Sequence, residues 1–93
     1  MSIPVENNPA ESRFQALVNG HLCVADYTLS PGVMQIVHTG VHPSLQGQGI
    51  GAALIAQAFE FARDHSLKID PVCSYVRVYI RRHPETQAWV ITP

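Results

Sequence analysis

The chain has 93 residues, 46% of them hydrophobic and only 14% charged, which predicts one domain with a single core and excludes a disordered chain. Six basic against seven acidic residues give a net charge of −1, which argues against a nucleic-acid partner, and no apolar run approaches the about 20 residues of a membrane span. The first residues do not resemble a signal peptide, and Cys23 and Cys73 form no CxxC pair, so we expect a cytoplasmic protein with free thiols and no metal site.

The first half of the chain predicts a leader followed by an antiparallel meander. Residues 1–12 are polar and contain two prolines, which suits a flexible leader outside the core. Residues 13–18 and 21–29 form strand patterns joined by Asn19-Gly20, a strong two-residue hairpin signal. A second turn at 30–32 leads to a third predicted strand over 33–41, which is rich in β-branched residues.

A covering helix is predicted after a glycine-rich break at 42–49. Its pattern runs from about Ile50 to His65 and is apolar except for a polar stripe of Gln57, Glu60 and Asp64. So broad an apolar surface has to be buried against a sheet.

The remaining residues predict a crossover and a second helix. Residues 67–72 form a short strand pattern, parallel to its neighbour because a helix precedes it. A helix is expected over 74–82 with Ser74 as its N-cap, and a last strand over 87–92. The predicted fold class is α+β: a mostly antiparallel sheet with one strand–helix–strand crossover and two helices, in one domain over residues 13–93.

The most informative stretch is a glycine loop, Gln46-Gly47-Gln48-Gly49-Ile50-Gly51-Ala52, between a strand and the start of a helix. Because glycine lacks a Cβ, several backbone N–H groups can approach one ligand, and the unpaired N–H groups of a helix start attract a phosphate or pyrophosphate. The alternative is a tight turn that only allows a close contact between helix and sheet.

Two other phosphate sites fit this loop poorly. A nucleoside-triphosphate loop is excluded because Gly-Lys-Ser/Thr does not follow Gly47 at the required spacing. The dinucleotide pattern Gly47-x-Gly49-x-x-Ala52, with Asp70 at the distance of a ribose-binding acid, matches in spacing. A meander does not supply the repeated strand–helix units of that fold, so we set the match aside.

The glycine loop resembles the phosphate-binding signature of the GNAT superfamily of acyl-CoA-dependent N-acetyltransferases, Gln/Arg-x-x-Gly-x-Gly/Ala. The chain is similar, over roughly residues 13 to 90, to a minimal subfamily of this length in which four motifs recur in order. They are present here as His38-Thr39-Gly40-Val41, Pro43-Ser44-Leu45-Gln46-Gly47-Gln48-Gly49, Pro71-Val72-Cys73 and His83-Pro84.

This resemblance implies that acetyl-CoA lies in a cleft between two splayed strands, with its pyrophosphate on the glycine loop and its pantetheine arm beside the third long strand. The implied coenzyme A-binding residues are Thr39, Gly40, Val41, Gln46, Gly47, Gln48, Gly49, Ile50, Gly51, Ala52 and Cys73.

Catalytic candidates follow from the chemistry, because acetyl transfer to an amine needs a base, oxyanion donors and a proton for the leaving thiolate. Gly40 stands where some members of the subfamily carry Glu, so His38 is the remaining candidate base, or else a strand histidine without a role. Cys73 resembles the subfamily cysteine near the coenzyme A thiol; it accepts the acetyl group, lines the thioester pocket or is inert. Tyr75 and Tyr79 are candidate acids or a packing pair.

The expected function is acetyl-CoA-dependent N-acetyl transfer to an unknown amine. Ordinary members shape the acceptor site with N-terminal helices, whereas this chain starts almost directly at a strand, so we expect an open site that suits a large acceptor such as a protein amine. The alternatives are a non-catalytic coenzyme A-binding module, which the missing acid at Gly40 favours, and an interaction domain without a ligand.

Overall fold

One mixed five-stranded sheet organises the computed structural model, which describes residues 3–91. Its strands lie in sequence order: β1 (Glu6–Asn8), β2 (Arg13–Val18), β3 (His21–Ser30), β4 (Val33–Gly40) and β5 (Lys68–Pro71). The first four are antiparallel, and β5 returns parallel to β4 after the helix α1 (Ile50–Asp64). The predicted α+β class, with its meander and strand–helix–strand crossover, is confirmed.

The first hairpin turn has the geometry that its sequence predicts. Asn19 and Gly20 both adopt positive φ, 50° and 79°, as the two central residues of a type I′ turn require. This turn aligns Val18 with His21 and so fixes the register of β2 and β3.

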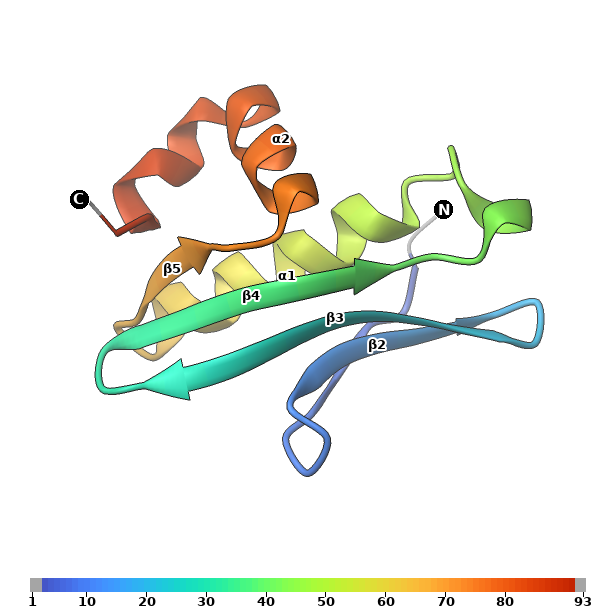
Figure 1. Ribbon diagram of the computed structural model, residues 1–93, viewed down its shortest axis with the longest axis horizontal. Helices are drawn as coiled ribbons and strands as arrows, with labels where there is room; N and C mark the ends of the chain where they lie inside the picture. Colours follow the sequence, from blue (N-terminus) through green and yellow to red (C-terminus); the bar gives the residue numbers. More distant parts are fainter. Residues whose placement is uncertain (1–2, 92–93) are drawn as a thin grey trace.

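One face of the sheet is covered by α1, which Figure 1 shows lying along the strands. Successive residues of a strand point to opposite faces, so one residue in two of each strand meets the helix. Full burial of a large apolar side chain contributes about 1.5–3 kcal/mol. The side chains buried in this layer include Phe14, Ala16, Ala25, Met34, Ile36, Leu54, Ile55, Ala58 and Ile69.

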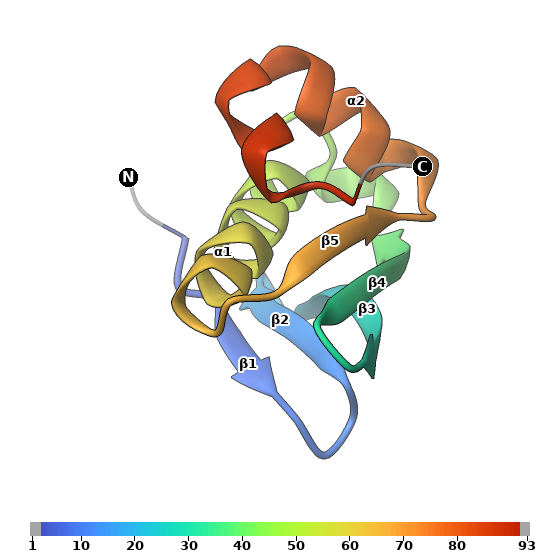
Figure 2. The same cartoon turned by 90° about the vertical axis from the view of Figure 1, so that its left-hand side faces the viewer.

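The other face is open where Leu17 and Leu22 pair across β2 and β3, since these side chains remain 69% and 47% exposed. The second helix, α2 (Ser74–Arg82), packs against α1 and β5 instead, as the turned view in Figure 2 makes clear. Its buried residues Val76 and Ile80 join the core. Both helices therefore leave that stretch of the sheet accessible.

The N-terminal segment differs from the expected loose leader. Glu6–Asn8 forms β1, which pairs with β2, and the Tyr27 hydroxyl donates a hydrogen bond to Asn7 Oδ1 at 2.7 Å. Pro4 and Pro9 flank this strand rather than interrupt it, so they do not remove any of its ladder N–H groups. Met1 and Ser2 lie outside the described residues.

The C-terminal strand prediction is also wrong in its main part. Residues Pro84–Trp89 form the 3-10 helix η2, with Pro84 in its first turn and the Thr86 hydroxyl bonded to the His83 carbonyl. Only Val90 makes a bridge, to Ile69, and Thr92 lies outside the described residues. The second helix has its predicted bounds, but its N-cap is Cys73 rather than Ser74.

Candidate functional site

A β-bulge in β4 determines which side chains reach the site. Tyr27 of β3 faces Ile36 of β4, but the next residue back along β3, Asp26, faces His38. Val37 is therefore an extra residue in β4, and the alternation of its side chains reverses after it. No sequence pattern in β4 alone announces this step.

The reversal places Thr39 and His38 on opposite faces of the sheet. Thr39 pairs with the buried Ala25 and lies on the α1 side, where it lines a cleft. His38 and Gly40 lie on the opposite, open side, and a Cβ at Gly40 would come 3.1 Å from His38 Nε2. His38 and Gly40 do share a face, as expected, but it is not the face of the cleft.

Beyond the bulge, β4 and β5 part. Their parallel pairing ends at Ile36 and Pro71, and the Cys73 N–H donates to the Ile36 carbonyl at 2.9 Å. The chain then turns away into α2, while β4 continues to Gly40. The structure thus contains the gap between strands that the resemblance implies, with Cys73 at its closed end.

Cys73 is a half-buried thiol at the N-cap of α2. Its Sγ lies 3.6 Å from Thr39 Oγ1 across the gap. Burial alone raises the pKa of this thiol, but the Thr39 hydroxyl and the backbone N–H groups of Tyr75, Val76 and Thr39 stabilise the thiolate. The net pKa of Cys73 is lowered from its ordinary value, although its side chain makes no direct capping hydrogen bond. A lowered pKa increases the share of thiolate, which is the nucleophilic form of a cysteine.

The glycine loop contains two glycines in a conformation that other residues rarely adopt. Gly47 and Gly49 adopt φ of 84° and 80°, a left-handed region that favours glycine. Gly49 caps α1 without a side-chain hydrogen bond, and the first helical bond runs from the Ala53 N–H to the Gly49 carbonyl. The N–H groups before Ala53 thus have no partner within the helix, and the first turn carries no acidic residue to compete for them.

A cleft of about 340 Å³ lies between this loop, the end of β4 and the start of α2. It brings together most of the predicted coenzyme A-binding residues, whereas Gly40, Gln48, Ala52 and Cys73 are not among those that line it. Leu45, which is buried, lines it too and was missed from the sequence. The lining residues are Thr39, Val41, Leu45, Gln46, Gly47, Gly49, Ile50, Gly51 and Tyr75.

Tyr75 forms one wall of the cleft by lying against Gly51. A Cβ added to Gly51 would come 2.6 Å from Tyr75 Oη, closer than any real Cβ contact. Gly51 therefore lets the Tyr75 ring of α2 lie directly against the first turn of α1. Tyr75 keeps 41% of its surface exposed and lines the cleft.

Tyr79 does not reach this cleft. It stacks on Phe59 and on His83, with ring centroids 5.9 Å and 4.2 Å away. Burial, followed by the charges of Glu85 and Tyr75, raises the pKa of Tyr79. With His83 it lines a separate groove that runs along α1 past Gln48 and Gly49. Of the two tyrosines, only Tyr75 is brought to the cleft.

A further residue missed from the sequence supports the loop. His42 precedes Pro43 and caps the 3-10 helix η1 (Pro43–Leu45), since its Nδ1 accepts the Ser44 N–H at 3.1 Å. The Gln46 side chain donates to the Val41 carbonyl at 3.4 Å and ties the loop back to the end of β4. A polar residue directly before a proline is a signal of such a cap.

Residues 3–91 contain no group of three His, Cys, Asp or Glu side chains that could hold a metal ion. Neither α1 nor any other helix of that range combines the length and apolar character needed to cross a membrane.

Comparison with known proteins decides the family. The family profile described as GCN5-related N-acetyl-transferase matches residues 13–89. The chain belongs to the GCN5-related N-acetyltransferase family. Its fold is similar to the solution structure of a GCN5-like protein from Staphylococcus aureus, with 28% identity, a TM-score of 0.77, and coverage of 100% of this chain and 93% of that one. Family membership assigns general acyltransferase chemistry with an acyl-CoA donor.

Proposed function

We propose that this family member transfers an acetyl group from acetyl-CoA to an amine, and that it does so in the cytoplasm. The observation that carries the proposal is the cleft in which the glycine loop, Thr39 and Tyr75 meet beside Cys73. The two free cysteines suit a reducing compartment.

The glycine loop would hold the pyrophosphate of the substrate. The free N–H groups at the start of α1 offer hydrogen bonds and the positive end of the helix dipole to an anion. The separate groove past Gln48 and Gly49 starts beside this point, and its lining includes His83, whose ring stacks on Tyr79 and would offer a surface to the adenine. The pantetheine arm would run from the loop toward Thr39 and Val41 at the end of β4.

Cys73 would act at the thioester end. Its thiolate attacks the acetyl carbonyl, the bond between that carbon and the coenzyme A sulfur breaks, and coenzyme A leaves as a thiolate. The amine then attacks the acetyl-cysteine, the bond between the acetyl carbon and Cys73 Sγ breaks, and Cys73 leaves as a thiolate. The candidate base His38 takes the proton that the nitrogen loses. The lowered pKa of Cys73 supports this role, and Tyr75 is the candidate that protonates the leaving thiolate.

The amine would approach from the open face of the sheet. His38 and Gly40 lie on that face, and no side chain at Gly40 narrows the approach. His38 is our candidate base, because a neutral imidazole can accept a proton and this side chain is exposed. An open face suits a large acceptor, such as an amine on a protein.

Calorimetric titration with acetyl-CoA and with coenzyme A, followed by intact mass of the acetyl-CoA sample, tests the proposal. We expect saturable binding and an added acetyl mass that is present in C23A but absent in C73A, since Cys23 is fully buried. Incubation with a mixture of amine-bearing peptides should then remove that mass from the protein. Binding without transfer to any peptide would favour the coenzyme A-binding module, and no binding would refute the assignment of the loop.

A further inference from the structure

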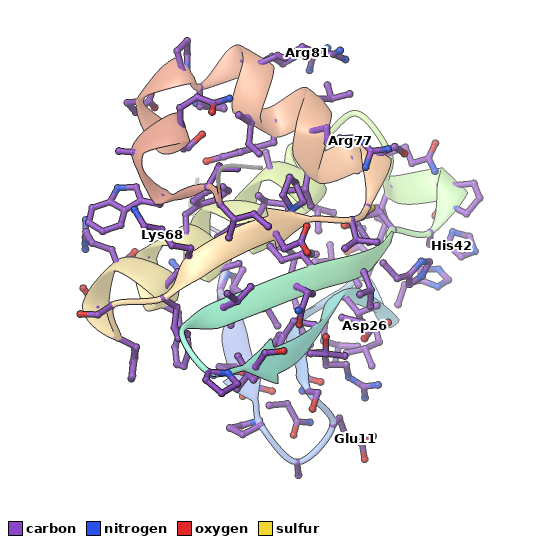
Figure 3. The ribbon with its side chains drawn as sticks, turned by 60° about the vertical axis from the view of Figure 1, so that its left-hand side comes forward. Glu11, Asp26, His42, Lys68, Arg77 and Arg81 are labelled. Carbon is purple, nitrogen blue, oxygen red and sulfur yellow. The ribbon has the colours of Figure 1, made fainter. Side chains whose placement is uncertain are left out.

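Arg77 of α2 binds the backbone that leads into Cys73. Its Nη1 donates to the carbonyls of Pro71 and Val72 at 2.9 Å and 2.8 Å. Figure 3 shows Arg77 at the junction between β5 and α2, while Arg81 lies further along the helix and points outward. A side chain in the first turns of α2 thus holds the two residues that come directly before the helix cap.

The junction is short and has few other restraints. Cys73 is fixed by its own N–H bond to Ile36, and its carbonyl accepts from the Val76 N–H at 3.1 Å. Val72 is 50% exposed, and its N–H bonds back to the Asp70 carbonyl, only two residues away. The backbone bonds to the Cys73 carbonyl leave Pro71 and Val72 unattached to the helix, and the Arg77 guanidinium supplies a side-chain contact that joins these two residues to it.

We propose that Arg77 is a positioning residue that holds the Cys73 thiol against Thr39 and the start of α2. The position of the thiol is a property of the free protein; only its effect on catalysis rests on the proposed function. The groups that set the pKa of Cys73 are the Thr39 hydroxyl on β4 and the N–H groups of Tyr75, Val76 and Thr39, together with burial. None of them is a charged side chain, so Arg77 acts on the thiol through the placement of the backbone.

The test compares R77M, which keeps the aliphatic stem without donors, with R77K, which restores a donor, and with R81M as the control for loss of charge on α2. The rate of alkylation by iodoacetamide is measured by intact mass from pH 5 to 10, with C73A to correct for Cys23. In R77M the midpoint of the rate profile should move to higher pH, and the rate at pH 7 should fall by about 3- to 10-fold. We expect this loss in R77M, partial recovery in R77K and no change in R81M.

The readout separates this inference from the proposed function, because alkylation needs neither coenzyme A nor an acceptor. A wild-type pH profile in R77M overturns the inference, even if the protein is an active transferase. An equal shift in R77M and R81M also overturns it, because the cause would then be charge. If R77M does not fold, R77K is compared with wild type: a profile shifted to higher pH supports the inference, and a profile that coincides with wild type contradicts it.

Discussion

Gly51→Ala tests the contact between the two helices most directly. The new Cβ would lie 2.6 Å from Oη and 2.8 Å from Cζ of Tyr75, whereas ordinary contacts begin at 3.4 Å. The ring must therefore move by roughly 0.8 Å or more. Overpacking of this kind costs about 1–3 kcal/mol, and the partly exposed Tyr75 ring can yield toward solvent, which favours the lower part of that range.

An opposite contribution comes from the helix itself. Alanine is favoured over glycine inside a helix by about 0.5–1 kcal/mol, and Gly51 lies in the first turn of α1 with no positive φ. The net result for G51A is a destabilisation of about 0.5–1 kcal/mol. For a domain of this size, that lowers Tm by about 2–8 °C.

A double-mutant cycle with Y75A should reverse the sign of the stability change caused by G51A. In the Y75A background the clash is gone, so G51A should stabilise the protein by about 0.5–1 kcal/mol. Urea and thermal unfolding of the four proteins, followed by circular dichroism without ligand, measure both steps. If G51A changes stability equally in the two backgrounds, Tyr75 does not lie against Gly51 and the geometry of this wall of the cleft is wrong.

Three further predictions concern the core, the loop and the response to alkali. Leu54→Ala should lower the free energy of unfolding, measured in urea, by about 2–5 kcal/mol because Leu54 is fully buried. Leu17→Ala on the open face should lower it by less than about 0.5 kcal/mol. Similar losses in the two variants would contradict the assigned layers. Gly49→Ala should cost about 1–2 kcal/mol, because its φ of 80° is left-handed, and should weaken coenzyme A binding in calorimetry; unchanged binding would argue against the loop as the anion site. Burial raises the pKa of Tyr27 and Tyr79, and at Tyr27 the hydrogen bond to Asn7 offsets part of this rise. The free energy of unfolding should therefore be retained below about pH 10 and fall as pH rises through the raised pKa values of the folded protein. A free energy of unfolding that stays constant from pH 9 to 11 would contradict this.

The elements predicted well from sequence are those specified by local rules. Asn19-Gly20 fixes a hairpin by its own backbone preferences, and the apolar pattern from Ile50 marks a helix that ends one residue before the predicted His65. The glycine loop was found for the same reason. Its glycines serve a local conformation that few other residues adopt.

What the sequence left open depends on partners distant in the chain. The bulge at Val37 exists only relative to β3, so the face of His38 could not be assigned from alternation along β4. Tyr75 and Tyr79 share a helix face, but one turn of rise separates them. That rise is enough to put one ring in the cleft and the other on Phe59.

Because of its extra residue, β4 contributes side chains to the core before Val37 and to the cleft after it. The core-facing residues before Val37 have even numbers, whereas Thr39, which faces the cleft, has an odd number. Deletion of Val37 would therefore leave a regular ladder in which His38 still pairs with Asp26 and Thr39 still pairs with Ala25. The strand can lose this one residue without moving a side chain between the cleft side and the open side of the sheet.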